Sequence, residues 1–166
     1  MNRIIAIILL SVINVYADTP LPTPSKVTGL SVNGQYEFVS DPQSGTRATE
    51  VRTGNILWTI DDWFRWCFLA DDGSHFVTGY NGLNLIPQNY KKDLVLITFW
   101  KNGTKIRKVT IEEIIPNLKI LEKTVSHYHW GTISGFTKNG LIEILLVNNE
   151  RIFYDPKTGN KTEQHN

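Results

Sequence analysis

The clearest residues with a capacity for chemistry are two histidines one position apart. His127 and His129 lie in a stretch, 127–134, whose alternation is typical of a β-strand. Alternate residues of a strand point to one face, so the two imidazoles would lie together as the start of a zinc or copper site. A third ligand would have to come from elsewhere, and three side chains are candidates: His75, Glu143 and Asp155. The alternative, which we favour, is a half-exposed strand with Tyr128 and Trp130 on the opposite face.

A second candidate is an aromatic-rich stretch, residues 58–68. It holds more rings than one face of a strand can bury, namely Trp58, Trp63, Phe64, Trp66 and Phe68. Exposed rings could stack on a sugar or on a partner protein, and we assign Trp63, Phe64 and Trp66 as candidate binding residues. The alternative is that the rings pack between neighbouring β units, which bury their faces only against one another. We favour packing.

The acidic residues give weaker indications of catalysis. Asp61-Asp62 and Asp71-Asp72 could in principle divide the roles of general acid and base. However, adjacent strand residues point to opposite faces, and Asp72-Gly73 is a hairpin signal, so we interpret both pairs as turn residues. The sequence contains no nucleophile elbow, phosphate loop, zinc-protease helix or Cys-x-x-Cys pair. We therefore expect no catalytic residues and no cofactor.

The single cysteine, Cys67, excludes an internal disulfide. It lies between Trp66 and Phe68, and free cysteine is among the most buried residue types, so we expect it to be buried. A reactive or intermolecular thiol is the alternative.

The N-terminus predicts export. Arg3, an apolar run to Val15 and the small-x-small pattern ending at Ala17 are typical of a signal peptide spanning residues 1–17. An uncleaved anchor is the alternative, but the apolar run is shorter than the roughly 20 residues of a spanning helix. We predict a secreted or periplasmic protein without a membrane span after cleavage. Alternate prolines follow, in a segment 18–29 that we interpret as a linker: Pro20, Pro22 and Pro24.

Cleavage would leave 166 − 17 = 149 residues, the size of one domain. Without Arg3 the chain has 17 − 1 = 16 basic residues against 16 acidic ones. A neutral balance argues against nucleic acid as the partner, since binding to it requires a basic surface. A protein or a carbohydrate remains the expected partner.

The elements themselves form three similar units within residues 30–163, followed by a tail, 164–166. Each unit has two turn signals of the Asn-Gly, Asp-Gly or Thr-Gly type, ending at Gly34 and Gly54, at Gly73 and Gly103, and at Gly140 and Gly159. The wider spacing in the middle unit predicts an inserted loop, 84–93. Thr110 with Glu113 has the spacing of a capping box and predicts a short helix that Pro116 ends.

Within the first unit, Ile56, Trp58 and Ile60 alternate with Leu57 and Thr59, which predicts a strand with the first three on the packed face. The preceding residues share their spacing with a known motif, in the form Ala48-x-Glu50-x-x-Thr53-Gly54-x-x-x-Trp58. This pattern resembles the tryptophan-docking motif of quinoprotein-type β-propellers, with Glu where that motif has Asp; the roughly 40-residue repeat is similar to WD40-type blades as well. The resemblance implies blade geometry; it does not imply a quinone cofactor.

These observations predict an all-β fold, an incomplete propeller-like array of about three antiparallel β units with one short helix. We expect an exported, non-catalytic binding or assembly module; the alternative is a small secreted metal-binding protein or hydrolase that uses His127 and His129. Three units leave two open faces. We expect a monomer in which the insertion 84–93 and the helix 110–115 cap the open side, with a homodimer as the alternative.

Overall fold

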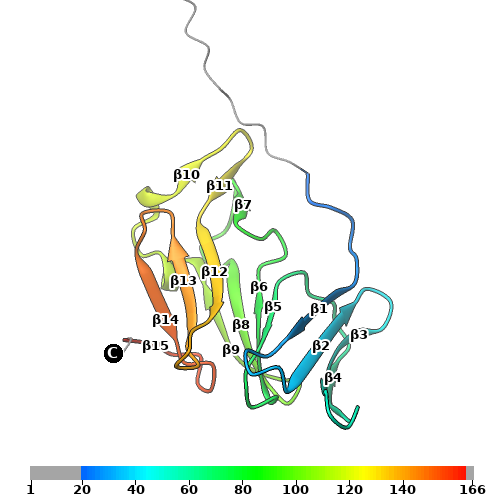
Figure 1. Cartoon of the computed structure of the whole chain (residues 1–166). Helices are drawn as coiled ribbons and strands as arrows, with labels where there is room; N and C mark the ends of the chain where they lie inside the picture. Colours follow the sequence, from blue (N-terminus) through cyan, green and yellow to red (C-terminus); the bar gives the residue numbers. More distant parts are fainter. Residues whose placement is uncertain (1–19, 164–166) are drawn as a thin grey trace, which may run out of the picture.

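The computed structural model describes residues 20–163, which form four antiparallel sheets (Figure 1). The first sheet contains β1 (Val27–Leu30), β2 (Tyr36–Asp41), β3 (Gly45–Glu50) and β4 (Ile56–Ile60) in chain order. The second contains β5 (Cys67–Leu69), β6 (His75–Gly79), β8 (Val95–Lys101) and β9 (Thr104–Thr110). The third contains β12 (Gly131–Phe136), β13 (Ile142–Leu146), β14 (Arg151–Tyr154) and β15 (Lys161–Thr162). A small sheet has the order β10 (Glu122–Lys123), β11 (His127–His129), β7 (Leu85–Pro87). The expected all-β fold with three antiparallel units and one short helix is confirmed.

Glycines at positive φ make the hairpins that build each sheet. In the last hairpin of the three large sheets, Gly54 (φ 73°), Gly103 (φ 76°) and Gly159 (φ 71°) occupy the left-handed region that other residues rarely adopt. The backbone N–H of Gly54 donates to the Glu50 carbonyl at 2.8 Å, and that of Gly159 donates to the Asp155 carbonyl at 2.7 Å. The turn signals in the sequence therefore predicted these strand connections correctly.

Two hydrophobic cores hold the large sheets together, and the second sheet contributes to both. Alternation along β6 sends Phe76 to one face and Val77 to the other. Phe76 joins the core shared with the first sheet, which also contains Phe38, Ala48, Trp58, Ile60, Cys67, Leu69 and Trp100. Val77 joins the larger core shared with the third sheet, which includes Phe99, Trp130, Ile144 and Tyr154. The second sheet is thus covered on both faces. Figure 1 shows the three sheets side by side as an open fan.

The capping box predicted at Thr110 is present. The helix α1 (Ile111–Ile114) begins with reciprocal contacts between Thr110 and Glu113, and Ile111 and Ile114 are buried in the larger core. A 3-10 turn, Leu118–Ile120, follows Pro116. The insertion 84–93, which we expected to be a loop, contains β7. This strand pairs with β11 about 40 residues later in the chain, with Ile86 opposite Tyr128.

The exposure of one side chain and the start of one strand differ from the sequence prediction. Ile56, expected on the packed face, is 60% exposed, because a bulge between Ala48 and Thr49 interrupts the alternation along β4. Strand β1 begins at Val27, inside the segment 18–29 that we interpreted as a linker. The predicted signal peptide lies outside the described residues, as does the tail. Within residues 20–163 no helix is long and apolar enough to cross a membrane.

Candidate functional site

The two candidate metal ligands lie on one face of β11, as the alternation predicted. His127 is opposite Pro87 and His129 is opposite Leu85, while Tyr128 between them packs on the larger core. His127 Nδ1 is 2.8 Å from the Ser126 hydroxyl. His129 Nδ1 is 3.4 Å from a carboxylate oxygen of Glu122. In the described part of the chain no three His, Cys, Asp or Glu side chains are grouped to hold a metal ion. A metal site at His127 and His129 stays a prediction without a third ligand.

The aromatic candidates Trp63, Phe64 and Trp66 are all partly buried. Trp63 donates its indole N–H to the Ser25 carbonyl at 2.9 Å. Phe64 packs against the first core, with its ring centroid 5.4 Å from that of Trp100. Trp66 packs against the larger core, 6.2 Å from the Trp130 ring. These contacts support the packing alternative, because each ring is used within the fold.

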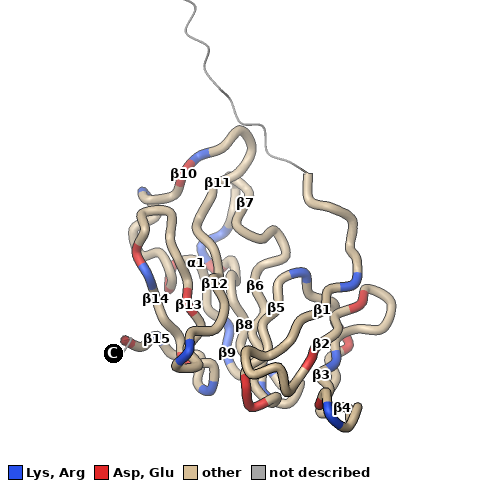
Figure 2. Tube along the Cα trace, in the orientation of Figure 1, with Lys and Arg blue, Asp and Glu red and all other residues tan. Residues whose placement is uncertain are grey.

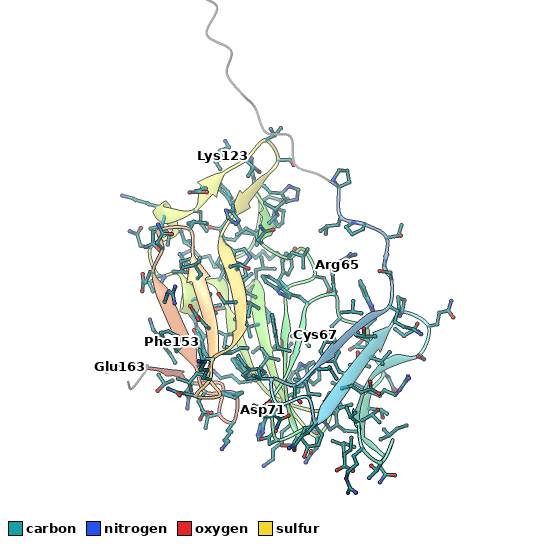
Figure 3. All side chains as sticks on the ribbon, in the orientation of Figure 1. Arg65, Cys67, Asp71, Lys123, Phe153 and Glu163 are labelled. Carbon is teal, nitrogen blue, oxygen red and sulfur yellow. The ribbon has the colours of Figure 1, made fainter. Side chains whose placement is uncertain are left out.

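The proline-rich segment is fastened to the connection between the first and second sheets. Arg65 (labelled in Figure 3) comes from this connection. It donates to the Pro22 carbonyl at 2.8 Å, and its guanidinium lies 5.0 Å above the Trp63 ring. Pro20 and Leu21 then line a pocket of about 410 Å³, to which the small sheet contributes His127. The segment that we interpreted as a linker is therefore held by side chains of the aromatic-rich stretch.

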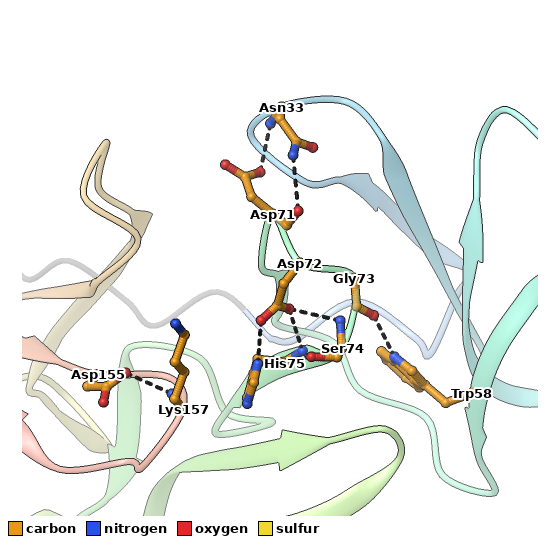
Figure 4. Close-up of polar contacts among 9 residues, drawn as sticks. All are labelled: Asn33, Trp58, Asp71, Asp72, Gly73, Ser74, His75, Asp155 and Lys157. Atoms are coloured by element: carbon orange, nitrogen blue, oxygen red, sulfur yellow. Dashed lines mark hydrogen bonds and ion pairs between the residues drawn. The ribbon is translucent and has the colours of Figure 1, made fainter.

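The predicted turn acids do stabilise turns. One carboxylate oxygen of Asp72 accepts hydrogen bonds from the backbone N–H groups of Ser74 and His75, each at 2.9 Å, and the other lies 2.6 Å from His75 Nδ1 (Figure 4). Partial burial raises the pKa of Asp72, but these hydrogen bonds outweigh burial and lower the pKa to about 2. A carboxylate of this kind is held ionised, which suits a structural role better than that of a general acid.

Cys67 is buried, and burial raises the pKa of its thiol to about 12. The thiol lies 3.2 Å from the Phe64 carbonyl. Because the thiolate is the nucleophile, a pKa this high leaves the group unreactive near neutral pH.

Trp58 joins the first sheet to the second. Its indole N–H donates to the Gly73 carbonyl at 2.8 Å in the β5–β6 turn (Figure 4). Its ring lies 5.1 Å from that of Phe76, and only 6% of the residue is exposed. Gly103 completes the receiving site, because a Cβ atom there would lie 2.5 Å from the Thr59 carbonyl oxygen. We refer to this contact as the tryptophan joint.

Arg107 joins the second sheet to the third from the equivalent position. In the first sheet the pair Ala48–Trp58 follows a bulge, and in the second sheet the pair Phe99–Arg107 follows the same kind of bulge. Arg107 donates to the Gly159 carbonyl at 3.0 Å and also contacts the Asn160 side chain. It is held by an ion pair with Glu113 at 2.7 Å. We refer to this contact as the arginine joint.

Sequence reasoning missed Arg107, although a signal was present. Trp58 lies four positions after Gly54, and Arg107 lies four positions after Gly103. The motif used in the sequence analysis also requires an alanine before the turn, like Ala48 before Gly54. The middle hairpin has a shorter loop and no alanine at that spacing before Gly103, so only the spacing after the glycine identifies Arg107. The same count in the third sheet reaches Glu163 (Figure 3), one residue beyond β15, but there the last strand pair has no bulge and Thr162 is the residue opposite Phe153.

Within residues 20–163, no other sheet packs on the outer side of the first sheet, and a pocket lies at its turns. Gly34 and Gln35 of the β1–β2 turn and Glu50, Val51 and Arg52 of the β3–β4 hairpin line a pocket of about 390 Å³. We refer to these five residues as the first-sheet pocket. Its position corresponds to that of the turns which receive Trp58 in the second sheet.

Figure 2 shows basic and acidic residues interspersed over the tube, in keeping with the nearly neutral balance of the sequence. The comparisons with protein-family models and with curated proteins gave no match for this chain. The two joints and the uncovered face of the first sheet are therefore the features that bear on function.

Proposed function

We propose that the protein is an exported, non-catalytic binding module that holds another protein against the outer face of its first sheet. The observation that carries this proposal is an asymmetry in burial. Among the described residues, the second sheet is covered on both faces, whereas the first sheet contributes side chains to one core only. The described residues include eight exposed large apolar side chains, and five of them belong to the first sheet and its turns: Leu30, Val32, Val51, Ile56 and Leu57.

Two of these side chains lie on one face of the sheet. Leu30 pairs with Glu37, which pairs with Thr49, which pairs with Ile56, so this row crosses all four strands. Directly paired residues share a face, and therefore Leu30 (62% exposed) and Ile56 (60% exposed) lie at the two ends of the same outer row. Glu37 and the buried Thr49 separate them, so the two side chains are separate apolar contact points on this face. The number of exposed apolar side chains on this one sheet and its turns, and not a continuous patch, is what favours a binding surface here. The blade resemblance supports the same proposal, because blades are stabilised by stacking on neighbours.

Site-specific photocrosslinking in the native host tests the proposal. Ile56 is replaced by benzoylphenylalanine in the full chain, and the matched control carries the same group at Val125, which is 58% exposed but lies at the small sheet. We expect a discrete adduct of higher mass from position 56 and none from position 125. Equal labelling at both positions, or no adduct at position 56, would contradict the proposal. N-terminal sequencing of the exported form should begin at Asp18.

A further inference from the structure

We infer that the partner protein inserts an extended segment with an acidic side chain between β1 and β5, the first strands of the first and second sheets. This inference rests on the proposed function and names the part of the partner that the surface fits. The two strands line a groove of about 270 Å³, with Phe38 and Phe136 beside them, and we refer to it as the edge groove. Leu30 and Val32, which belong to the exposed apolar set of the first sheet, line it as well.

Two contacts hold the strands at both ends of the edge groove, so its shape is formed in advance. At one end the Trp63 indole N–H donates to the Ser25 carbonyl at 2.9 Å. At the other end the Asn33 backbone N–H donates to an Asp71 carboxylate oxygen at 2.7 Å (Figure 4). Residues 25 and 33 flank β1, while residues 63 and 71 flank β5, so the two strands run in the same direction. A groove formed in advance binds a segment without the cost of ordering its own walls.

The edge of β1 that faces away from β2 has unused backbone groups. The Ser31 N–H donates to the Tyr36 carbonyl at 2.8 Å and continues the ladder between β1 and β2. Bonded and non-bonded pairs alternate along an antiparallel ladder, so the N–H and C=O groups of Thr28 and Leu30 point away from β2. Both residues are exposed, and within residues 20–163 no hydrogen bond joins these groups to another strand. An added strand would pair with them.

The edge of β5 has unused backbone groups too, and there they are buried. The Ala70 N–H donates to the His75 carbonyl at 2.9 Å, toward β6. By the same alternation, the backbone groups of Cys67 and Leu69 point away from β6. Leu69 is 2% exposed, and in the described part of the chain its N–H and C=O have no hydrogen-bond partner on that side. Buried backbone groups are nearly always paired, and a backbone segment in the edge groove would supply the partner.

The two strands also lack the residues that usually protect an edge. The long outer edge β9 contains Lys105, Arg107 and Lys108, and such charges oppose the addition of another strand. Strand β4 is uncharged, but the Gly103 turn lies against its Thr59 carbonyl oxygen. Strands β1 and β5 contain neither a charged residue nor a proline. These two edges are therefore suited to receive a strand.

Arg65, at one end of the edge groove, determines the charge of the inserted segment. Its guanidinium donates to the Pro22 carbonyl and lies above the Trp63 ring, and among residues 20–163 no carboxylate pairs with it. Its Nε–H is buried and has no hydrogen-bond partner in the described chain. A guanidinium without a counter-charge favours a carboxylate, whose two oxygens match its donors. The inserted segment therefore carries Asp or Glu.

This requirement favours a different protein over a second copy of this chain as the source of the segment. A second copy would have to offer one of its own edge strands. Of the edge strands in the described chain, only β10 contains a carboxylate, Glu122, and that strand has two residues. The basic residues of β9 would repel Arg65. Charge complementarity thus points to an acidic segment of a partner protein.

Titration of the exported protein with two blocked pentapeptides, followed by amide NMR shifts, tests the inference. The first peptide is acetyl-Thr-Val-Glu-Val-Thr-amide, and the second has Gln in place of Glu. At millimolar concentration of the first peptide we expect shifts at Thr28, Leu30 and Leu69, and the second should bind at least about fivefold more weakly. Arg65→Gln should remove this preference. Trp63→Phe, which removes the other contact to the N-terminal segment but keeps Arg65, is the matched control and should retain the preference.

Two substitutions of Leu30 separate the backbone from the side chain. Leu30→Pro removes the N–H that points away from β2 and leaves the ladder with β2 intact, and proline is tolerated at such edge positions. It should weaken binding of the glutamate peptide by about tenfold. The matched control Leu30→Ala keeps the N–H and should change binding by less than about twofold. If Leu30→Pro lowers the melting temperature, Thr28→Pro, which removes the other outward N–H, replaces it.

The outcomes separate this inference from the proposed function. No shifts at millimolar peptide, shifts only outside β1 and β5, or equal weakening by Leu30→Ala and Leu30→Pro would overturn the insertion of a strand. Equal binding of the two peptides would overturn the acidic assignment. An adduct at position 56 without peptide binding would leave the binding module standing and remove this inference. Peptide binding without an adduct would support the edge groove and contradict the outer face as the site of contact. A wild-type dimer that Leu30→Pro dissociates would identify a second copy as the source and overturn the assignment to a partner protein.

Discussion

Replacing Trp58 by alanine should destabilise the protein strongly, because the indole ring fills the space between the first and second sheets. The residue is 6% exposed, and deletion of a buried large aromatic side chain costs about 3–5 kcal/mol. The same change leaves the Gly73 carbonyl without its indole donor. For a chain of this length each kcal/mol corresponds to roughly 2–4 °C in melting temperature, so we expect a decrease of about 6–20 °C.

Two further variants separate the loss of the indole N–H from the loss of the ring and provide an exposed control. Trp58→Phe keeps a ring beside Phe76 but removes the N–H, so it should cost about 1–3 kcal/mol, the range for an unsatisfied buried acceptor. Ile56→Ala, two residues away and 60% exposed, should change the free energy of unfolding by about 0.5 kcal/mol or less. Thermal and urea denaturation measure all three. A decrease in melting temperature of less than about 2 °C for Trp58→Ala would refute the assignment of Trp58 to the joint. So would a decrease for Ile56→Ala that equals the decrease for Trp58→Ala.

Three other substitutions and one labelling experiment test separate features of the fold. Arg107→Leu should speed amide exchange in the third sheet more than in the first, because it removes the donor to the Gly159 carbonyl. The pKa of Asp72 is lowered in the folded state, so its contribution to stability is present above about pH 4 and is lost as the pH falls toward about 2. In Asp72→Asn the midpoint of urea denaturation should therefore change less with pH over that range than in the wild type. Cys67 should react with Ellman's reagent at pH 8 only on unfolding, since its pKa is raised to about 12. Gly73→Ala should lower the melting temperature more than Gly140→Ala, because both glycines have positive φ but only the first would contact Tyr36.

The hairpins were predictable from the sequence because their signals are local. All six glycines of the predicted turn signals adopt positive φ. The dipeptide alone is not sufficient, because Thr28-Gly29, Thr78-Gly79 and Asn81-Gly82 have the same residue types and their glycines are not at positive φ. The helix at Ile111 was predictable for the same reason, since Thr110 and Glu113 cap it with their own side chains. The burial of Trp58 followed from its spacing to the hairpin and is confirmed.

The remaining features depend on contacts between distant residues. Strand β7 forms because β11 pairs with it, and nothing in residues 85–87 alone separates a strand from a loop. The exposure of Ile56 depends on a bulge in its own strand: Leu57 has no partner in β3, so Ile56 and Trp58 pair with adjacent residues and lie on opposite faces. The partners of Trp63 and Arg65 are backbone carbonyls of the N-terminal segment, and such carbonyls exist at every residue, so composition does not mark them.

The three large sheets show how a repeated hairpin connects one sheet to the next. Trp58 and Arg107 each lie four positions after a hairpin glycine, and in both sheets a bulge precedes the residue and turns its side chain toward the following sheet. Both side chains donate to backbone carbonyls of that sheet. The last strand pair of the third sheet has no such bulge: Thr162 lies opposite Phe153, and Glu163, four positions after Gly159, lies beyond β15. The hairpin glycine alone therefore does not produce a joint; the bulge that follows it is the feature that the first two sheets share and the third lacks.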